Sequence, residues 1–318
     1  MRSGPFALLV LACFLALWGG KAALAAWVPA AHEAAVAAPA SPERPMIVPP
    51  KPAGLTQPAP APDAAAEVPR LTEAACLARP ATLHDLCFQA LARQTAAEDP
   101  ASAARTCARV VEEELHDECL ADVAEAAAPA HRQEAVALCV AMPRPRWRGQ
   151  CHFGIGLALA ETDPAWAFGR CAHAEAFRDF CRHDVVGEIA LADLEAAVGL
   201  CAREEGDALT RKSCWHGIGK YLARRDATTA LVTCLRATPG WRGNCAHGAG
   251  WGAAERDADA ALAACAAAGP YADNCRHGVA AQLKRIDPER ALALCGRLAD
   301  ATLASRCTAF VRRAPVGF

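Results

Sequence analysis

The element Cys-x-His recurs in this chain, and it is the pattern whose residue types most suggest chemistry. It stands at Cys181, Cys214, Cys245 and Cys275, so the histidines are His183, His216, His247 and His277. Imidazole and thiolate groups are common ligands of zinc and of softer transition metals. On a regular helix, however, residues i and i+2 point about 200° apart, so the two groups of one element cannot bind the same ion.

Sixteen of the seventeen cysteines follow a regular spacing. An interval of twenty positions, as from Cys87 to Cys107, recurs seven times and alternates with gaps of ten to thirteen positions. A period of about 30 to 33 residues is typical of a repeat array. The sixteen are Cys76, Cys87, Cys107, Cys119, Cys139, Cys151, Cys171, Cys181, Cys201, Cys214, Cys234, Cys245, Cys265, Cys275, Cys295 and Cys307.

Each twenty-position interval has the features of two helices joined by a short turn. The twelfth residue after the first cysteine is Asp in six of the seven units, where its carboxylate would cap a helix. An alanine follows four positions later in every unit, and the fourth residue after the first cysteine is apolar, as expected of buried helix faces. The predicted caps are Asp99, Asp163, Asp193, Asp226, Asp257 and Asp287, with His131 in the remaining unit. The sequence therefore predicts an all-α fold, an αα-hairpin repeat solenoid of about eight repeats over residues 70–318, with one disulfide per repeat.

Two disulfide schemes fit this geometry. One joins cysteines across the variable gaps and uses all sixteen in eight pairs, beginning with Cys76–Cys87 and ending with Cys295–Cys307. The other closes each twenty-position hairpin and leaves Cys76 and Cys307 unpaired. We favour the first, because a bridge across the gap holds two helix ends together whatever the length of the loop; spacing alone leaves both open.

The histidines are expected to form a spaced structural or surface row. Packed helices lie about 10 Å apart, so histidines of neighbouring repeats would be too distant to share one coordination shell. Covalent haem attachment needs a Cys-x-x-Cys-His run, which the sequence lacks. Glycine follows three of the histidines, at Gly217, Gly248 and Gly278, and mid-helix glycine indicates close approach of a neighbouring backbone. The alternative is a ligand bound along this His-Gly edge.

Three arginines are candidates for a binding surface. Arg148, Arg178 and Arg242 each follow an aromatic residue shortly before the second cysteine of a pair. Solvated arginines near helix starts are the simpler interpretation. The functional one is a row that recognises acidic peptide or glycan groups.

The N-terminal residues carry targeting features. Arg2 precedes an apolar run, and Ala23 and Ala25 form an A-x-A cleavage pattern, so residues 1–26 are predicted to be a signal peptide or, if uncleaved, a membrane anchor. Residues 27–69 are rich in Pro and Ala and are predicted to be a linker. Together with the cysteine content, this indicates a periplasmic or secreted protein, anchored in the inner membrane if the first segment is retained.

The segments DPERALALC and GIGKYLARRDATTAL, with one cysteine pair per repeat, resemble the tetratricopeptide and Sel1-like superfamily, in particular the secreted Cys-rich Sel1-like proteins. The resemblance covers residues 70 to 312 and implies a helical-repeat fold that binds partners; it transfers no catalytic residue.

We therefore expect a non-catalytic binding or scaffold protein of the cell envelope that binds a protein or peptide and uses no cofactor. The net charge of -2 argues against nucleic acid as a partner. The membrane would be contacted only through an uncleaved N-terminal segment. The alternatives are a metal- or haem-associated periplasmic protein that uses the histidine row, and an envelope hydrolase of cell-wall fragments.

Overall fold

The computed structural model of the chain describes residues 70–204 and 208–313. The predicted signal or anchor segment and the Pro/Ala-rich linker lie outside these residues. Within them all regular secondary structure is helical and no strand occurs, so the fold is all-α as predicted. No helix in this part of the chain combines the length and apolar character needed to cross a membrane.

Longer and shorter helices alternate along the chain. The longer ones are α4 (His84–Thr95), α6 (Glu113–Ala127), α8 (Pro145–Ala158), α10 (Arg178–Ala192), α12 (Ala208–Ala223), α14 (Arg242–Ala254), α16 (Ala272–Leu283) and α18 (Ala301–Arg312). The shorter ones are α3 (Glu73–Leu77), α5 (Pro100–Cys107), α7 (Arg132–Ala141), α9 (Pro164–Arg170), α11 (Leu194–Arg203), α13 (Ala227–Cys234), α15 (Ala258–Ala264) and α17 (Pro288–Cys295). Short 3₁₀ segments precede several longer helices: η1 (Ala81–Leu83), η2 (Cys171–His173), η3 (Glu175–Phe177), η4 (Pro239–Trp241) and η5 (Cys265–Tyr271).

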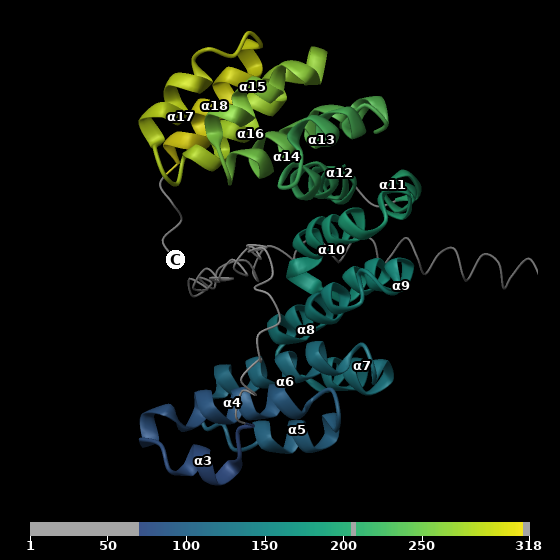
Figure 1. Cartoon of the computed structure of the whole chain (residues 1–318), viewed down its shortest axis with the longest axis vertical. Coiled ribbons are helices and arrows are strands. Elements are labelled where there is room, and N and C mark those ends of the chain that lie inside the picture. Colours follow the sequence, from purple (N-terminus) through teal and green to yellow (C-terminus); the bar gives the residue numbers. More distant parts are fainter. Residues whose placement is uncertain (1–69, 205–207, 314–318) are drawn as a thin grey trace, which may run out of the picture. The chain divides into compact units, whose positions relative to one another are not determined.

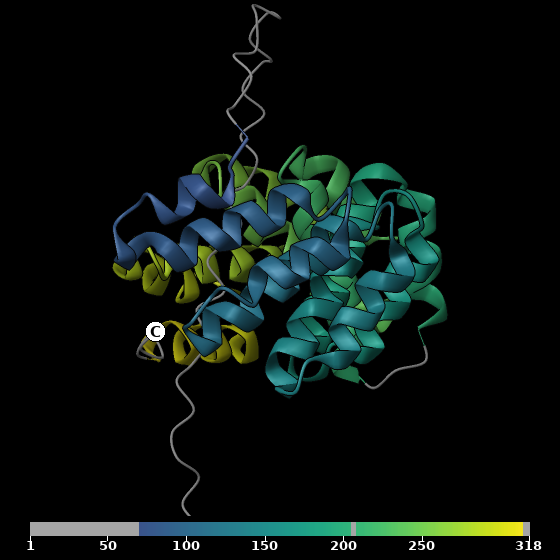
Figure 2. The same ribbon diagram turned by 90° about the horizontal axis from the view of Figure 1, so that it is seen from below.

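Each longer helix from α4 to α16 packs against the shorter helix that follows it, which makes an αα-hairpin, and against the next longer helix along the chain (Figure 1). Figure 2 shows the same relation for the N-terminal helices, drawn in blue, which lie side by side. The hairpins are therefore stacked repeats, and the fold is the predicted helical-repeat solenoid.

The aspartate caps form as predicted. Asp99, for example, accepts a hydrogen bond from the backbone N–H of Ser102 at 2.9 Å, and the five other predicted aspartates cap their helices in the same way. His131 occupies the equivalent position before α7 but makes no capping bond through its side chain. The caps begin the second helix of each hairpin and so set the position of the turn.

The core is built from small side chains. The repeated alanine of the shorter helices is buried at Ala103, Ala135, Ala167, Ala197, Ala230, Ala261 and Ala291. The fourth residue after each first cysteine is buried too, at Leu91, Val123, Ile155, Val185, Ile218, Ala249 and Val279. Alanine buries little apolar area, so hydrophobic burial per repeat is modest and covalent links between the repeats matter more to stability.

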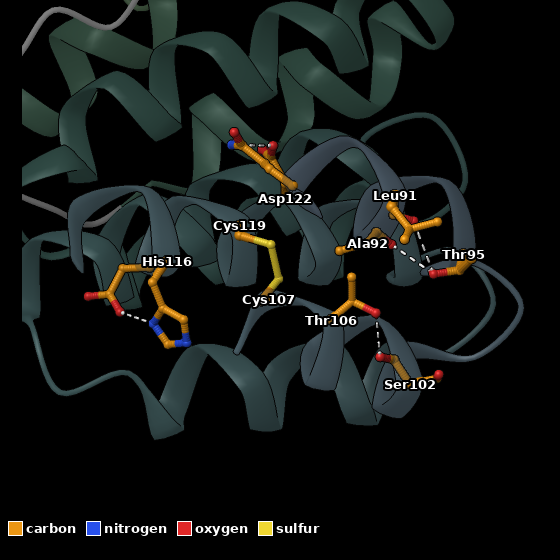
Figure 3. Close-up of a disulfide and its surroundings, with 11 residues drawn as sticks. Leu91, Ala92, Thr95, Ser102, Thr106, Cys107, His116, Cys119 and Asp122 are labelled. Atoms are coloured by element: carbon orange, nitrogen blue, oxygen red, sulfur yellow. Dashed lines mark hydrogen bonds and ion pairs between the residues drawn. A yellow bond between two sulfur atoms is a disulfide. The ribbon is translucent and has the colours of Figure 1, made fainter. Parts of the chain in front are cut away.

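All sixteen cysteines between residues 76 and 307 are joined in pairs across the variable gaps, as the first scheme predicts. The Cα–Cα distances within the pairs run from 5.3 to 5.7 Å. In Figure 3, Cys107 at the end of α5 is bonded to Cys119 of α6. Each disulfide therefore joins the end of one hairpin to the first two turns of the next longer helix.

Replacing both Cys234 and Cys245 with alanine is expected to lower the free energy of unfolding by about 3 kcal/mol, because the 11-residue loop is then no longer closed in the unfolded chain. Urea unfolding followed by circular dichroism measures this loss. Thr238→Ala, in the same loop with the disulfide intact, is the control and should change stability by less than about 0.5 kcal/mol. A Cys214–Cys234 link in a non-reducing peptide map would contradict the pairing.

Candidate functional site

Four histidines of Cys-x-His elements lie in an unbroken line across α10, α12, α14 and α16. We call His183, His216, His247 and His277 the histidine ladder. His183 Nε2 lies 2.8 Å from His216 Nδ1, and His216 Nε2 lies 3.0 Å from His247 Nδ1. The ring of His277 meets that of His247 edge-on, with centroids 4.7 Å apart. The first three imidazoles are therefore joined by hydrogen bonds.

The expected separation of about 10 Å between these histidines is wrong, and the glycines explain why. A Cβ atom added at Gly217 would lie 2.1 Å from the carbonyl oxygen of His183, and one added at Gly248 would lie 2.2 Å from that of His216. Gly278 has the same relation to His247, at 1.9 Å. Because these positions lack a side chain, successive helices touch backbone to backbone, and the predicted close approach of the next repeat is confirmed. The 10 Å expectation assumed ordinary side chains between the helices.

Asp184 lies at the α10 end of the ladder and determines which nitrogen of each ring donates its hydrogen bond. Its Oδ1 lies 2.5 Å from His183 Nδ1. Burial alone would raise the pKa of Asp184, but the hydrogen bond from His183 and the charge of that ring bring it below its ordinary value, so the group is a carboxylate that only accepts. His183 must then donate through Nδ1. If the rings are neutral, His216 donates through Nδ1 to His183, and His247 donates through Nδ1 to His216.

Aromatic side chains enclose the ladder. Trp251 packs edge-on to His216 and His247, with ring centroids 5.9 and 6.1 Å apart, and Tyr221 does the same to His183 at 6.0 Å. Tyr221 also hydrogen-bonds Asp184. The imidazoles are thus shielded from water on these sides and have little room to rotate.

Burial keeps His216, His247 and His277 neutral near pH 7. It lowers the pKa of His247 to about 3, with the charges of His277 and Lys212 acting in the same direction. Burial also lowers the pKa of His216 well below its ordinary value, helped by the neighbouring histidines, and that of His277 in the same direction. Protonation of one of these rings is therefore unfavourable, because the resulting positive charge would be buried away from water.

The hydrogen bonds between these imidazoles do not by themselves form the coordination shell of a metal ion. In the part of the chain that the structure describes, no group of three or more His, Cys, Asp or Glu side chains is arranged to hold a metal ion. The cysteines of the repeats are all in disulfides and present no thiolate.

A second cluster lies at the start of α10, in a hollow of about 290 Å³ lined in part by Arg148, His152, His173, Glu175 and Arg178. Arg148 donates to Glu175 Oε1 through Nε and Nη2, at 2.9 and 2.7 Å. Glu175 adopts φ of 51°, a left-handed conformation unusual for a residue other than glycine. The structure thus brings together two of the three predicted arginines.

Arg242, the third, lies elsewhere and holds a loop. Its Nε donates to the carbonyl of Ala237 at 3.0 Å, inside the gap closed by the Cys234–Cys245 disulfide. Arg148 makes a comparable bond through Nη1 to the carbonyl of Met142 at 3.2 Å. These two arginines therefore satisfy backbone carbonyls, whereas Arg178 is exposed.

Sequence reasoning missed several members of both clusters. His173 also follows a cysteine by two positions, Cys171, which closes a twenty-position interval and does not open one. Trp251 and Lys220 lie four residues after His247 and His216, a helical spacing that places them on the same face and was available from the sequence. Nothing in the sequence signals that Asp184 ends the ladder.

No protein-family model, no curated protein and no solved structure matches this chain. The helix pairs and the disulfide of each repeat are therefore established from the structure of this chain and not from a relative.

Gly248→Ala is expected to lower the free energy of unfolding by about 1 to 3 kcal/mol, because the new methyl group overlaps the His216 carbonyl oxygen. Gly169→Ala in α9 is the matched control. Nothing lies within 4 Å of its added Cβ, so it should be neutral or stabilise by up to about 1 kcal/mol. Urea unfolding of both variants measures the difference; equal effects would show that the close helix contact is unimportant.

Stability should fall in acid partly through His152. It is 3 % exposed, and burial lowers its pKa to about 4, with His173, Arg170 and Arg148 adding to the effect. A histidine in the unfolded chain has a pKa of about 6.5, so below that pH the unfolded state binds the extra proton. Above about pH 6.5, His152 makes no contribution to the pH dependence of the free energy of unfolding. Between about pH 6.5 and about pH 4, it lowers that free energy by about 1.4 kcal/mol for each pH unit of acidification. Urea unfolding of His152→Phe should show a pH slope shallower by this amount; an unchanged slope would contradict the assignment.

Proposed function

We propose that this protein is a non-catalytic binding protein of the periplasm or the extracellular space, and that its helical repeats recognise an acidic group on a protein or peptide partner. The observation that carries the proposal is the hollow at the start of α10, where two arginines and two histidines face a single carboxylate, Glu175. Such an excess of donors favours an anionic ligand.

The contact between Arg148 and Glu175 indicates how a carboxylate fits this hollow. One oxygen of the Glu175 carboxylate, Oε1, accepts from two N–H donors of the same guanidinium, which makes a charge-assisted contact. Arg178 lines the same hollow and is exposed, and within the described residues no hydrogen bond or ion pair engages its side chain. It is the group available to a partner's carboxylate.

His152 supports the same assignment. Its Nδ1 is buried and has no hydrogen-bond partner among the described residues, an unusual state for a nitrogen of a histidine that is only 3 % exposed. Arg148, Arg170 and His173 all disfavour its protonation, which marks the surroundings as electropositive.

The compartment and the repeat architecture fit a binding role. Eight disulfides in one chain indicate an oxidising environment. Disulfides between successive hairpins restrict their relative movement, so a surface composed of several repeats is pre-organised and loses little entropy on binding. We also propose that the chain is a member of the Cys-rich Sel1-like group and that its signal peptide is cleaved. The single disulfide per repeat supports the first proposal, and the residue pattern of positions 1–26 supports the second.

The test uses a fluorescently labelled peptide of alternating glutamate and glycine as the probe. Binding measured by fluorescence anisotropy should weaken as salt is raised, and Arg178→Ala should raise the Kd about ten-fold, the loss of one charge-assisted contact. Arg297→Ala, an exposed arginine outside the hollow, should leave the Kd unchanged. Equal loss in both variants, or no binding of the peptide to the native protein, would overturn the proposal.

A further inference from the structure

We infer that His183, His216 and His247 of the histidine ladder form a proton-gated lock: they hold α10, α12 and α14 together while they carry no more than one added proton, and a second proton opens the lock. The inference rests on the hydrogen-bond geometry of three rings and on the confinement of those rings, and it is independent of the proposed binding function.

The count of hydrogens begins with the neutral ladder. His183, His216 and His247 have six ring nitrogens, of which four lie in the two ring-to-ring contacts, one faces Asp184 and one, Nε2 of His247, remains. Three neutral rings carry three N–H groups. Each contact then has one donor and one acceptor, and every hydrogen bond is made.

One added proton can be accommodated without breaking a contact. When Nε2 of His247 is protonated, the Nδ1 proton of His247 can pass to Nε2 of His216, and the Nδ1 proton of His216 can pass to Nε2 of His183. The charge then rests on His183, whose Nδ1 lies 2.5 Å from the Asp184 carboxylate. Both contacts still pair one donor with one acceptor, in the reverse direction.

A second proton cannot be accommodated. Five N–H groups on six nitrogens leave a single nitrogen without hydrogen, so at least one of the two contacts has a donor on both sides. At nitrogen separations of 2.8 and 3.0 Å there is no room for two facing hydrogens, and two of the three adjoining rings then carry a positive charge. That contact has to open.

The charged groups around the ladder favour opening over further proton uptake. Lys212 and Lys220 of α12 and Arg306 of α18 act on its rings as positive charges, and Asp184 is the carboxylate hydrogen-bonded to it. Glu255 of α14 is paired with Lys220 and Arg224 instead. Tyr221, hydrogen-bonded to Asp184, is held neutral because burial raises its pKa, and the negative charges of Asp184 and Glu188 act in the same direction.

Opening a contact requires movement of helices, because the rings are confined. Trp251 and Tyr221 pack against their edges, and the backbones of α12 and α14 already touch at Gly248. A ring that turned away would meet one of these aromatic side chains. Separation of α12 from α14, or of α10 from α12, is the available response. The low pKa of His247 and of His216 agrees with this, since the folded ladder resists protons that the opened one accepts.

The experiment follows the oxidised full chain, in EDTA so that no metal contributes, from about pH 7.5 to about pH 4.5. Hydrogen exchange measured by mass spectrometry should show protection factors in α10, α12 and α14 falling about ten-fold per pH unit in the acid range, the dependence expected when the open ladder holds one proton more than the closed ladder. Helices α4 to α7, which lack the ladder, are the internal reference and should lose less than about two-fold per unit over the same range. Parallel loss in both regions would overturn the inference.

The variant His216→Phe removes the central ring and should abolish the acid dependence in α10, α12 and α14. His131→Phe, in the N-terminal repeats and outside the ladder, is the matched control and should retain it. Should His216→Phe fail to fold, ¹⁵N spectra of histidine-labelled native protein decide the matter: His216 and His247 should be Nδ1–H tautomers at neutral pH and Nε2–H tautomers after the first proton. Independent titration of the rings near pH 6.5, with no exchange of tautomer, would overturn the lock.

Discussion

The disulfide at each junction between hairpins is the constraint on which the rest of the structure depends. It holds the end of a shorter helix within 5.3 to 5.7 Å, Cα to Cα, of a residue in the first two turns of the next longer helix. Because the same restraint recurs eight times, the residues that follow the second cysteine of each pair occupy equivalent positions on successive helices. A residue type repeated at that position therefore becomes a line across the repeats, and the histidines of α10 to α16 are such a line.

Glycine then decides how close the repeats come. Among α10, α12, α14 and α16 the longer helices touch backbone to backbone at Gly217, Gly248 and Gly278, and the histidine rings reach one another. In α8 the equivalent site holds Phe153, a buried apolar side chain, so the ladder stops at His183 and its last ring turns to Asp184. Close approach of the helices thus produces a buried row of hydrogen-bonded imidazoles. In the inference drawn above, both ring-to-ring hydrogen bonds are made only while the rings carry no more than one added proton.

Helix α10 connects the two clusters of the molecule. Its first residue, Arg178, lines the hollow proposed to bind an acidic group, and His183, five positions on, is the end of the ladder. The core around both consists largely of alanine, cystine and glycine contacts, with few large side chains wholly buried. Such a core draws its rigidity from disulfide bonds more than from buried apolar area, which is why a chain this rich in alanine can still hold charged and titratable groups in fixed positions.

The sequence by itself determined what depends on short-range chemistry. Asp99 and its equivalents cap helices because a carboxylate next to free N–H groups does so wherever the chain continues as a helix, and the fixed interval between Cys87 and Cys107 follows from the length of a hairpin. The sequence favoured the pairing across the gaps, which uses every cysteine of the repeats, and the structure decided between the two schemes. Only the tertiary structure decided that His183, His216 and His247 are in contact, that Asp184 orients them, and that Arg148 and Arg178 share a hollow while Arg242 does not. The histidine contacts depend on how closely the helices approach where glycine leaves no side chain between them. The hollow depends on the path of an irregular gap segment, that of Glu175. Neither property is encoded in the spacing of residues along the chain.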